Sequence, residues 1–102
     1  MPSHPTLRFA AIGLDHRHIY DQVKSLLDIG AQCVGFWTAE DTLPVQGFVE
    51  RFPHVPRVQD RRQLLEDASV QLITCAAIPR DRAAHAIEAM RHGKDFMVDK
   101  IG

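Results

Sequence analysis

The turn Gly13-Leu-Asp-His-Arg-His18 contains residue types that could hold an anion at the start of a helix. It follows a short apolar run and precedes an amphipathic helical pattern. The free amide N–H groups and the partial positive charge of a helix N-terminus attract phosphate. His16 and His18 could donate further hydrogen bonds, whereas Asp15 would oppose an anion placed directly on it.

The glycines of this turn match a dinucleotide-binding motif only in part. Such a site has glycines at the first, third and sixth positions, and here Gly13 is followed by Asp15 and His18 at the other two. The alternative is a tight strand-to-helix turn that binds nothing, and the glycine count leaves both open. A metal site would need Asp15, His16 and His18 to converge. Because neighbouring side chains on a turn diverge, we expect no bound metal.

A second candidate position follows the apolar run 33–37. An NAD site prefers a carboxylate about 20 residues after the glycines, where it holds the adenosine ribose. Counting places Thr38 at this position, and Glu40 could serve if the turn is one or two residues longer. Alternatively, Glu40 and Asp41 are acidic residues in the first turn of the next helix. The sequence therefore leaves NAD and NADP open.

Strand-like and helix-like patterns alternate along the whole chain. Short apolar runs predict strands, and apolar stripes at helical spacing predict amphipathic helices. The predicted strands are 7–12, 33–37, a very short one around Val58, 70–76 and 96–98. The predicted helices are 18–29, ended by Gly30; one with the stripe Val45, Phe48, Val49 and Phe52; a short one that the capping-box spacing of Asp60 and Gln63 opens; and one from Pro79 to Gly93, on which Ala83, Ala84, Ile87 and Met90 share a face.

This alternation predicts an α/β fold with five strands. Strands that alternate with helices pair in parallel through right-handed crossovers. We expect an open, doubly wound parallel sheet of order 3-2-1-4-5, with helices on both faces. Ligands of such sheets bind at the carboxyl ends of the strands, where the strand order reverses. Gly13, after the first strand, should therefore lie beside Ala77, after the fourth.

The later part of the sequence carries a family resemblance. Segments 73–79, 84–90 and 92–100 resemble the Gfo/Idh/MocA oxidoreductases, a family named after glucose–fructose oxidoreductase and inositol dehydrogenase. Its members have a Thr-Pro-Asn-like turn, a helix that ends in Ala-Gly-Lys, and a Glu-Lys-Pro motif. Here these motifs read Ala77-Ile78-Pro79, His92-Gly93-Lys94 and Asp99-Lys100-Ile101. Together with the first strand and its turn, the resemblance covers essentially all 102 residues.

The resemblance implies a Rossmann domain that binds NAD or NADP. It places Lys100 beside the nicotinamide, in contact with substrate, where a lysine could polarise an oxygen atom by donating a hydrogen bond. It implies that Ala77, Ile78 and Pro79 pass under the nicotinamide ribose and that Asp99 belongs to the cofactor site. Lys94 is expected to be structural. The chain departs from the family in its missing glycines and in Ile101, which stands where members have proline.

The implied function is that of the cofactor-binding domain of an NAD(P)-dependent oxidoreductase. It would move a hydride to or from a hydroxyl-bearing carbon of a small-molecule substrate such as a sugar or polyol. Family members are several times longer, so we expect residues 1–102 to be a fragment without the C-terminal substrate domain and without activity alone. That domain would also supply much of any homo-oligomer interface. The alternative is a non-catalytic Rossmann-like binding or assembly module that has lost dinucleotide binding.

Charge and hydropathy argue against several other classes. Lys and Arg number 12 against 13 Asp and Glu, so the net charge of −1 does not fit a nucleic-acid binder. No apolar run approaches the roughly 20 residues that span a bilayer. The start also lacks a signal-peptide pattern, so we expect a cytoplasmic protein with no membrane partner. Cys33 and Cys75 lie in apolar runs and are expected to be buried thiols.

Overall fold

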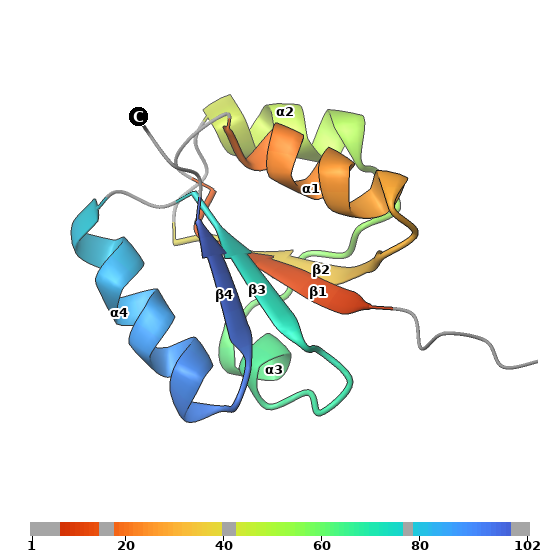
Figure 1. Ribbon diagram of the computed structural model, residues 1–102. Coiled ribbons are helices and arrows are strands. Elements are labelled where there is room, and N and C mark those ends of the chain that lie inside the picture. The colour runs from red at the N-terminus through yellow and green to blue at the C-terminus, as the bar shows by residue number, and fades with distance from the viewer. Residues whose placement is uncertain (1–6, 15–17, 40–42, 77–78, 99–102) are drawn as a thin grey trace, which may run out of the picture.

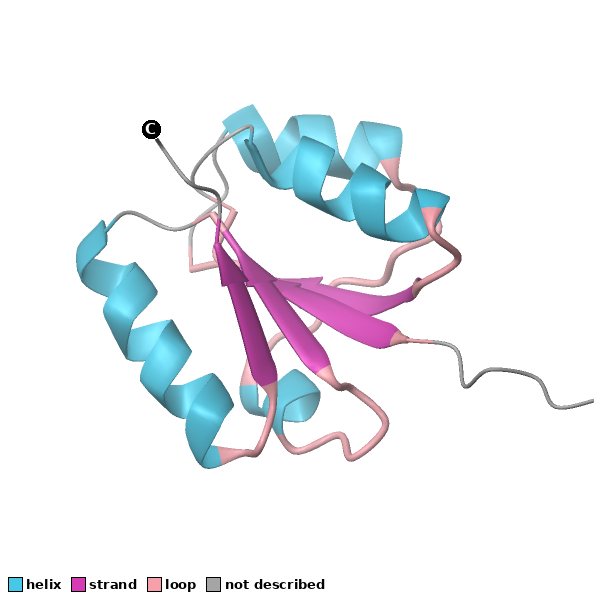
Figure 2. Ribbon diagram, in the orientation of Figure 1, coloured by secondary structure: helices cyan, strands magenta, loops and turns pink. Residues whose placement is uncertain are grey.

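Strands and helices alternate along the described chain (Figures 1 and 2). The structure is a computed structural model that describes residues 7–14, 18–39, 43–76 and 79–98. In chain order the elements are β1 (Arg8–Ile12), α1 (His18–Asp28), β2 (Gln32–Trp37), α2 (Leu43–Arg51), α3 (Arg62–Leu65), β3 (Leu72–Cys75), α4 (Pro79–Arg91) and β4 (Asp95–Val98). None of the helices in these residues is both long and apolar enough to cross a membrane.

The strands form one parallel sheet with the order β2-β1-β3-β4. On one side of β1, Phe9 is opposite Cys33 of β2, and on the other side it is opposite Leu72 of β3. Leu72 is in turn opposite Asp95 of β4. The predicted α/β class with a parallel sheet is therefore confirmed, and the architecture is Rossmann-like.

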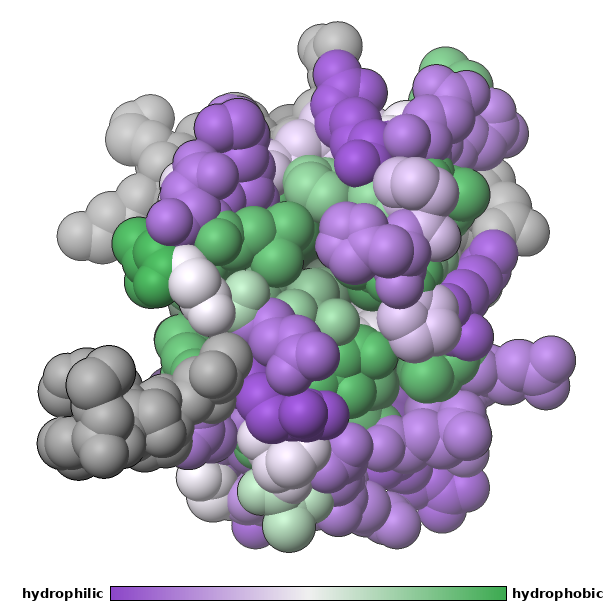
Figure 3. Space-filling model, turned by 90° about the vertical axis from the view of Figure 1, so that its right-hand side faces the viewer, coloured by the Kyte–Doolittle hydropathy of each residue, from purple (hydrophilic) through white to green (hydrophobic). Residues whose placement is uncertain are grey.

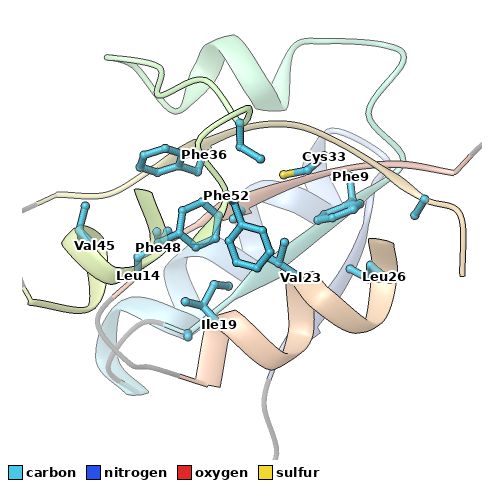
Figure 4. Packing of buried hydrophobic residues seen from close by; sticks show 14 residues of the cluster. Phe9, Leu14, Ile19, Val23, Leu26, Cys33, Phe36, Val45, Phe48 and Phe52 are labelled. Atoms are coloured by element: carbon cyan, nitrogen blue, oxygen red, sulfur yellow. The ribbon is translucent and has the colours of Figure 1, made fainter. Parts of the chain in front are cut away.

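Helices cover both faces of the sheet. Figure 1 shows α1 and α2 on one face and α3 and α4 on the other. Side chains alternate along β1, so Phe9 and Ala11 join the core under α1 and α2, while Ala10 and Ile12 join the core on the side of α3 and α4. In the first core (Figure 4), the ring centroid of Phe48 is 4.9 Å from those of both Phe36 and Phe52. A short apolar strand is held in place because both of its faces are covered.

The five-strand sheet and its order 3-2-1-4-5 are not confirmed. Among the described residues four strands pair, and the segment around Val58 makes only an isolated parallel bridge, Phe36 with Arg57. Two hydrogen bonds hold it: the Phe36 N–H donates to the Pro56 carbonyl at 3.0 Å, and the Val58 N–H donates to the Phe36 carbonyl at 2.9 Å. Proline offers no N–H for a ladder, and Asp60 already begins the approach to α3, so this segment is too short to form a strand.

Glycines end two of the helices as predicted. Gly30 follows α1 with φ 92° and Gly93 follows α4 with φ 72°. At each end the glycine N–H and the next N–H bond back to carbonyls of the last turn; after α4, for example, the Lys94 N–H donates to the Ala89 carbonyl at 3.0 Å. A left-handed residue at this position satisfies carbonyls that the helix leaves open.

The predicted capping box of Asp60 and Gln63 forms only in part, since the Gln63 N–H donates to the Asp60 main-chain carbonyl and not to its carboxylate. The Gln63 side chain accepts the Asp60 N–H at 3.2 Å, and the Asp60 carboxylate accepts the Arg62 N–H at 2.9 Å. These two bonds satisfy amide groups that the first turn leaves without helical partners. It starts α3, whose Leu64 and Leu65 are both buried.

The apolar face expected on α4 points away from the sheet. Ile87 is 48% exposed and Met90 is 63% exposed, and Ala83 and Ala84 are also exposed. The helix instead packs on the sheet through its own residue Ala89, which is fully buried. A small residue lets the helix approach the sheet closely, and the half-buried His85 and Glu88 make the polar contacts described below.

The amino-terminal ends of the strands lie on the side shown in Figure 3. On this face hydrophobic side chains are visible between hydrophilic ones.

Lys94, just before β4, is 7% exposed, and its Nζ donates to the carbonyls of Asp67 at 2.8 Å and Val70 at 2.6 Å. Burial lowers the pKa of this ammonium group. Lys94 therefore has the structural role expected for it: its hydrogen bonds connect the end of α4 with the loop before β3.

Candidate functional site

Gly13 joins the carboxyl ends of three strands. Its N–H donates to the Trp37 carbonyl of β2 at 2.8 Å, and its carbonyl accepts the Ala76 N–H, directly after β3, at 2.9 Å. Its φ of 84° is in the region that favours glycine. The chain therefore leaves β1 through a turn that is bonded to both neighbouring strands. This is the point at which the strand order reverses.

Two helices start from the same edge of the sheet. α1 begins at His18, five residues after Gly13, and α4 begins at Pro79, three residues after Ala76. Both run from the carboxyl edge toward the amino edge (Figure 1). Their first N–H groups have no helical acceptors and carry partial positive charge. The edge beside Gly13 therefore has donors suited to an anionic group.

The described residues include only some of the predicted site residues. Gly13 and Thr38 are described with their surroundings, and His18 and Pro79 are placed as the first residues of α1 and α4. The other seven lie outside the described residues: Asp15, His16, Glu40, Ala77, Ile78, Asp99 and Lys100. The neighbour of Ala77 in the chain, Ala76, lies beside Gly13 as the predicted topology requires. No group of three metal-ligating side chains occurs within the described ranges.

A cleft of about 540 Å³ lies at the carboxyl end of β2. Two segments line it, residues 37–39 and 57–59. The second segment is held against β2 by the bridge at Phe36 and by the Trp37 indole N–H, which donates to the Gln59 carbonyl at 3.3 Å. Thr38, the residue counted to the ribose position, is 5% exposed at this cleft. The structure thus places Thr38 in a concave site.

The side chains of Arg61 and His85 pack against the Trp37 ring. The Arg61 guanidinium lies 5.5 Å from the Trp37 ring centroid, and the His85 ring packs edge-on at 6.0 Å. Arg61 donates to both carboxylate oxygens of Glu88, at 2.8 and 3.1 Å. The hydrogen bond from Arg61 lowers the pKa of Glu88, and Glu88 in turn raises the pKa of Arg61. The sequence did not indicate this cluster, because its members are far apart in the chain.

A buried polar link connects α1 with β3 near the same edge. The Thr74 hydroxyl is hydrogen-bonded to the Gln22 amide oxygen, and the Gln22 amide nitrogen donates to the Cys75 carbonyl at 3.4 Å. Thr74 is fully buried and Gln22 is 6% exposed. A signal for Gln22 was present in the sequence: it stands between Ile19 and Val23 on the apolar stripe of α1. A polar residue on a buried stripe needs a partner.

The two cysteines are the buried free thiols that were expected. Burial raises the pKa of Cys33 to about 12, although its thiol also donates to the Gly35 carbonyl. A thiol with this pKa is almost entirely protonated at neutral pH and is a poor nucleophile. Cys33 is therefore a packing residue.

Comparison with known proteins relates the chain to solved oxidoreductase structures. No family model and no curated protein matches the sequence. A protein from Erwinia carotovora atroseptica SCRI1043, described as a "putative oxidoreductase", is 44% identical over 94% of this chain with a TM-score of 0.88. Biliverdin reductase from Synechocystis sp. PCC 6803, in complex with biliverdin and NADP+, is 22% identical over 92% of this chain with a TM-score of 0.73. At that identity the second match shows the fold alone.

Fold and comparisons together define a Rossmann-like α/β domain. The chain covers 28% of the first of these solved proteins and 29% of the second. It therefore spans less than a third of their length. What the structure shows directly is the carboxyl edge at Gly13 and the cleft beside Thr38.

Proposed function

We propose that this chain is the NAD(P)-binding domain of an oxidoreductase of the Gfo/Idh/MocA family. The observation that carries the proposal is the junction at Gly13, where the ends of β1, β2 and β3 meet beside the starts of α1 and α4. A dinucleotide lies across this reversal point in doubly wound sheets, with its pyrophosphate at a helix N-terminus. The 44% identity to an oxidoreductase described as putative, and the NADP+ complex of biliverdin reductase, support the same assignment.

The chain's own residues would bind and orient the dinucleotide. The backbone around Gly13 and the start of α1 would hold the pyrophosphate, with His16 and His18 as added donors and Asp15 beside them. Thr38 and Glu40 would face the adenosine ribose. Ala77, Ile78 and Pro79 would pass the nicotinamide ribose. A bound nicotinamide supplies or accepts the hydride.

Lys100 and Asp99 extend the proposal to the reacting end of the cofactor. By the family resemblance, Lys100 would donate a hydrogen bond to the substrate oxygen, which stabilises the charge that develops there during hydride transfer. Asp99 precedes it in the sequence and would belong to the cofactor site. We propose a small hydroxyl-bearing substrate, such as a sugar or polyol, held by a C-terminal domain that is absent from these 102 residues. That domain would also support a homo-oligomer, and a cytoplasmic location fits the chemistry.

The test is direct titration with NADH and NADPH. Trp37 is the only tryptophan of the chain and lines the cleft proposed for the adenosine end, so binding of the reduced dinucleotide should quench its fluorescence. We expect saturable quenching, and we expect Gly13→Ala to weaken binding at least tenfold. Gly93→Ala is the matched control, because Gly93 also has a positive φ but lies at the opposite edge, and an added Cβ there would meet no other atom. The variant Ala77→Asp should weaken binding by placing a negative charge beside the cofactor.

Two results would reject the proposal. The first is no binding of either cofactor at millimolar concentration by folded protein, which would favour a binding or assembly module that has lost the dinucleotide. The second is equal loss of binding in Gly13→Ala and Gly93→Ala. That result would show a general loss of stability and no local site. Circular dichroism establishes that each variant is folded before titration.

A further inference from the structure

We propose that Gln22 and Thr74 are positioning residues of the cofactor site, and that their hydrogen bonds fix the start of α1 against the end of β3. This inference rests on the proposed function, because the start of α1 and the end of β3 are two sides of the proposed pyrophosphate site. Neither side chain is among those expected to touch the dinucleotide. They would act through the backbone groups that do.

Gln22 connects α1 with β3 through a single side chain. It lies four residues after the first residue of α1. Its amide oxygen is hydrogen-bonded to the Thr74 hydroxyl, and its amide nitrogen donates to the carbonyl of Cys75, the last residue of β3, at 3.4 Å. The amino-terminal part of α1 is therefore bonded to both a side chain and the backbone at the carboxyl end of this strand.

One peptide group at the end of β3 bonds to both ends of the strand-to-helix turn. Its carbonyl, that of Cys75, accepts the Gln22 amide, and its N–H, that of Ala76, donates to the Gly13 carbonyl at 2.9 Å. Gly13 lies before the turn and Gln22 lies after it. Figure 1 shows the start of α1 at the edge of the sheet where β3 ends. The segment proposed to carry the pyrophosphate is thus anchored on each side to the same point of the sheet.

Burial gives these hydrogen bonds a geometric role. Thr74 is fully buried and Gln22 is 6% exposed. Loss of hydration offsets most of what the hydrogen bonds contribute, so an apolar pair of the same shape would give similar stability. Apolar contacts have no preferred direction, whereas a hydrogen bond requires a definite distance and angle. The polar pair therefore contributes more to the orientation of α1 than to stability.

The orientation of α1 matters because backbone groups would bind the ligand. The N–H groups at the helix start must point at the phosphate oxygens, and such groups have to be held within roughly 0.5 Å of the binding geometry. Among the side chains of α1 that the structure describes, Gln22 is the only buried polar one. The Tyr20 hydroxyl donates to the Pro44 carbonyl and so connects α1 with α2, not with the sheet. The directional bonds between α1 and the sheet are therefore those of Gln22.

The experiment uses four variants to separate position from stability. Thr74→Val replaces the hydroxyl with a methyl group of similar size, and Thr74→Ser keeps the hydroxyl and removes the methyl group. The double variant Gln22→Met with Thr74→Val replaces the whole link with apolar side chains. Lys94→Met is the control, because it removes buried hydrogen bonds at the opposite edge of the sheet. Urea unfolding gives the stability of each variant, and titration with NADH, NADPH and ADP gives its affinities.

We expect stability and affinity to change independently. Thr74→Val and the double variant should bind the dinucleotide and ADP about tenfold more weakly, although the double variant should be more stable than Thr74→Val. Thr74→Ser should lose stability through its missing methyl group and keep its affinities within about twofold of the native chain. Lys94→Met should likewise lose stability and keep its affinities. ADP carries the pyrophosphate without the nicotinamide, so an equal loss for ADP assigns the effect to the pyrophosphate end.

Three results would overturn the inference and leave the proposed function intact. The first is native affinity in the folded double variant. The second is affinity that follows stability across the four variants, because the link would then only support the fold. The third is weaker binding of the dinucleotide with unchanged binding of ADP. If the double variant does not fold, Thr74→Val and Thr74→Ser decide alone, and equal affinities in these two overturn the inference. If the native chain binds none of the three ligands, the inference and the proposed function both fail.

Discussion

Arg61 and Glu88 form a two-point ion pair that ties the segment before α3 to α4 behind Trp37. The guanidinium nitrogens lie 2.8 and 3.1 Å from the two carboxylate oxygens. The side chains are 38% and 29% exposed, so solvent screens the pair in part. The pair holds α4 against the end of β2, where the cleft begins.

Breaking this pair should lower stability modestly. We expect Glu88→Gln to reduce the free energy of unfolding by about 0.5–1 kcal/mol at neutral pH, with solvent screening taken into account. The control is Arg62→Gln, since the Arg62–Asp60 pair is 68% and 45% exposed and should contribute less. Urea unfolding followed by Trp37 fluorescence measures both. A larger loss in Arg62→Gln would contradict the ranking.

The same pair predicts a pH dependence. The hydrogen bond from Arg61 lowers the pKa of Glu88 from its ordinary value of 4.5. The carboxyl group therefore ionises more readily in the folded state than in the unfolded state. The stabilisation is complete above pH 4.5 and is lost as pH falls through the lowered folded pKa. The stability difference between the native chain and Glu88→Gln should therefore shrink below pH 4.5. A difference that stays constant down to pH 3 would show that the charge is not responsible.

The buried link between Gln22 and Thr74 should show strong coupling. Thr74→Val removes the hydroxyl and leaves a buried amide oxygen with one partner fewer, at a cost of about 1–3 kcal/mol. Gln22→Met similarly removes the hydrogen bonds that Gln22 makes with the Thr74 hydroxyl and the Cys75 carbonyl. The double variant should lose less than the sum of the two single losses, because no polar group is then stranded between them. Additive losses in urea unfolding would contradict a direct link.

Lys94 should matter more for stability than an ordinary lysine. Lys94→Met keeps the length of the side chain but leaves the Asp67 and Val70 carbonyls without its ammonium donor. We expect a loss of about 1–3 kcal/mol. Lys24→Met is the control, because the Lys24 side chain is 70% exposed and its ion pair with Asp28 is on the surface. Thermal unfolding should separate the two, and equal melting temperatures would contradict the structural role.

The cysteines should react slowly in the folded protein. At pH 8 the Cys33 thiol, with its pKa of about 12, is almost fully protonated, and Cys75 is fully buried. A disulfide reagent should therefore modify both only as fast as the protein opens, and at once in guanidinium. Cys33→Ala isolates the reaction of Cys75. Rapid modification of one thiol in the native chain would disprove the burial of that residue.

The sequence alone was sufficient for the class of fold and most of its elements. Apolar runs predicted the four strands of the described residues, and helical stripes together with the capping-box spacing predicted the four helices there, because these signals are local. Gly30 and Gly93 were recognisable as helix ends since they are local requirements of the backbone. The expected strand at Val58 was not confirmed, because pairing depends on N–H groups that the nearby prolines lack.

The candidate site, like the fold, could be predicted from the sequence only in part. Gly13 and Thr38 could be found by counting from the ends of strands. The second wall of the cleft, residues 57–59, became apparent only in three dimensions, because its place depends on the chain returning to β2 across the bridge with Phe36. The orientation of α4, with its apolar face outward, also depends on tertiary contacts. Glu88 contacts Arg61 and His85 contacts Trp37, and these contacts orient the helix.

Local patterning thus determined which segments are strands and helices, since apolar residues recur with the period of the element that contains them. Only the tertiary structure decided which polar side chains meet, because Arg61 with Glu88 and Gln22 with Thr74 are pairs brought together by the packing of helices on the sheet. Such contacts between residues far apart in the sequence cannot be predicted from local patterns.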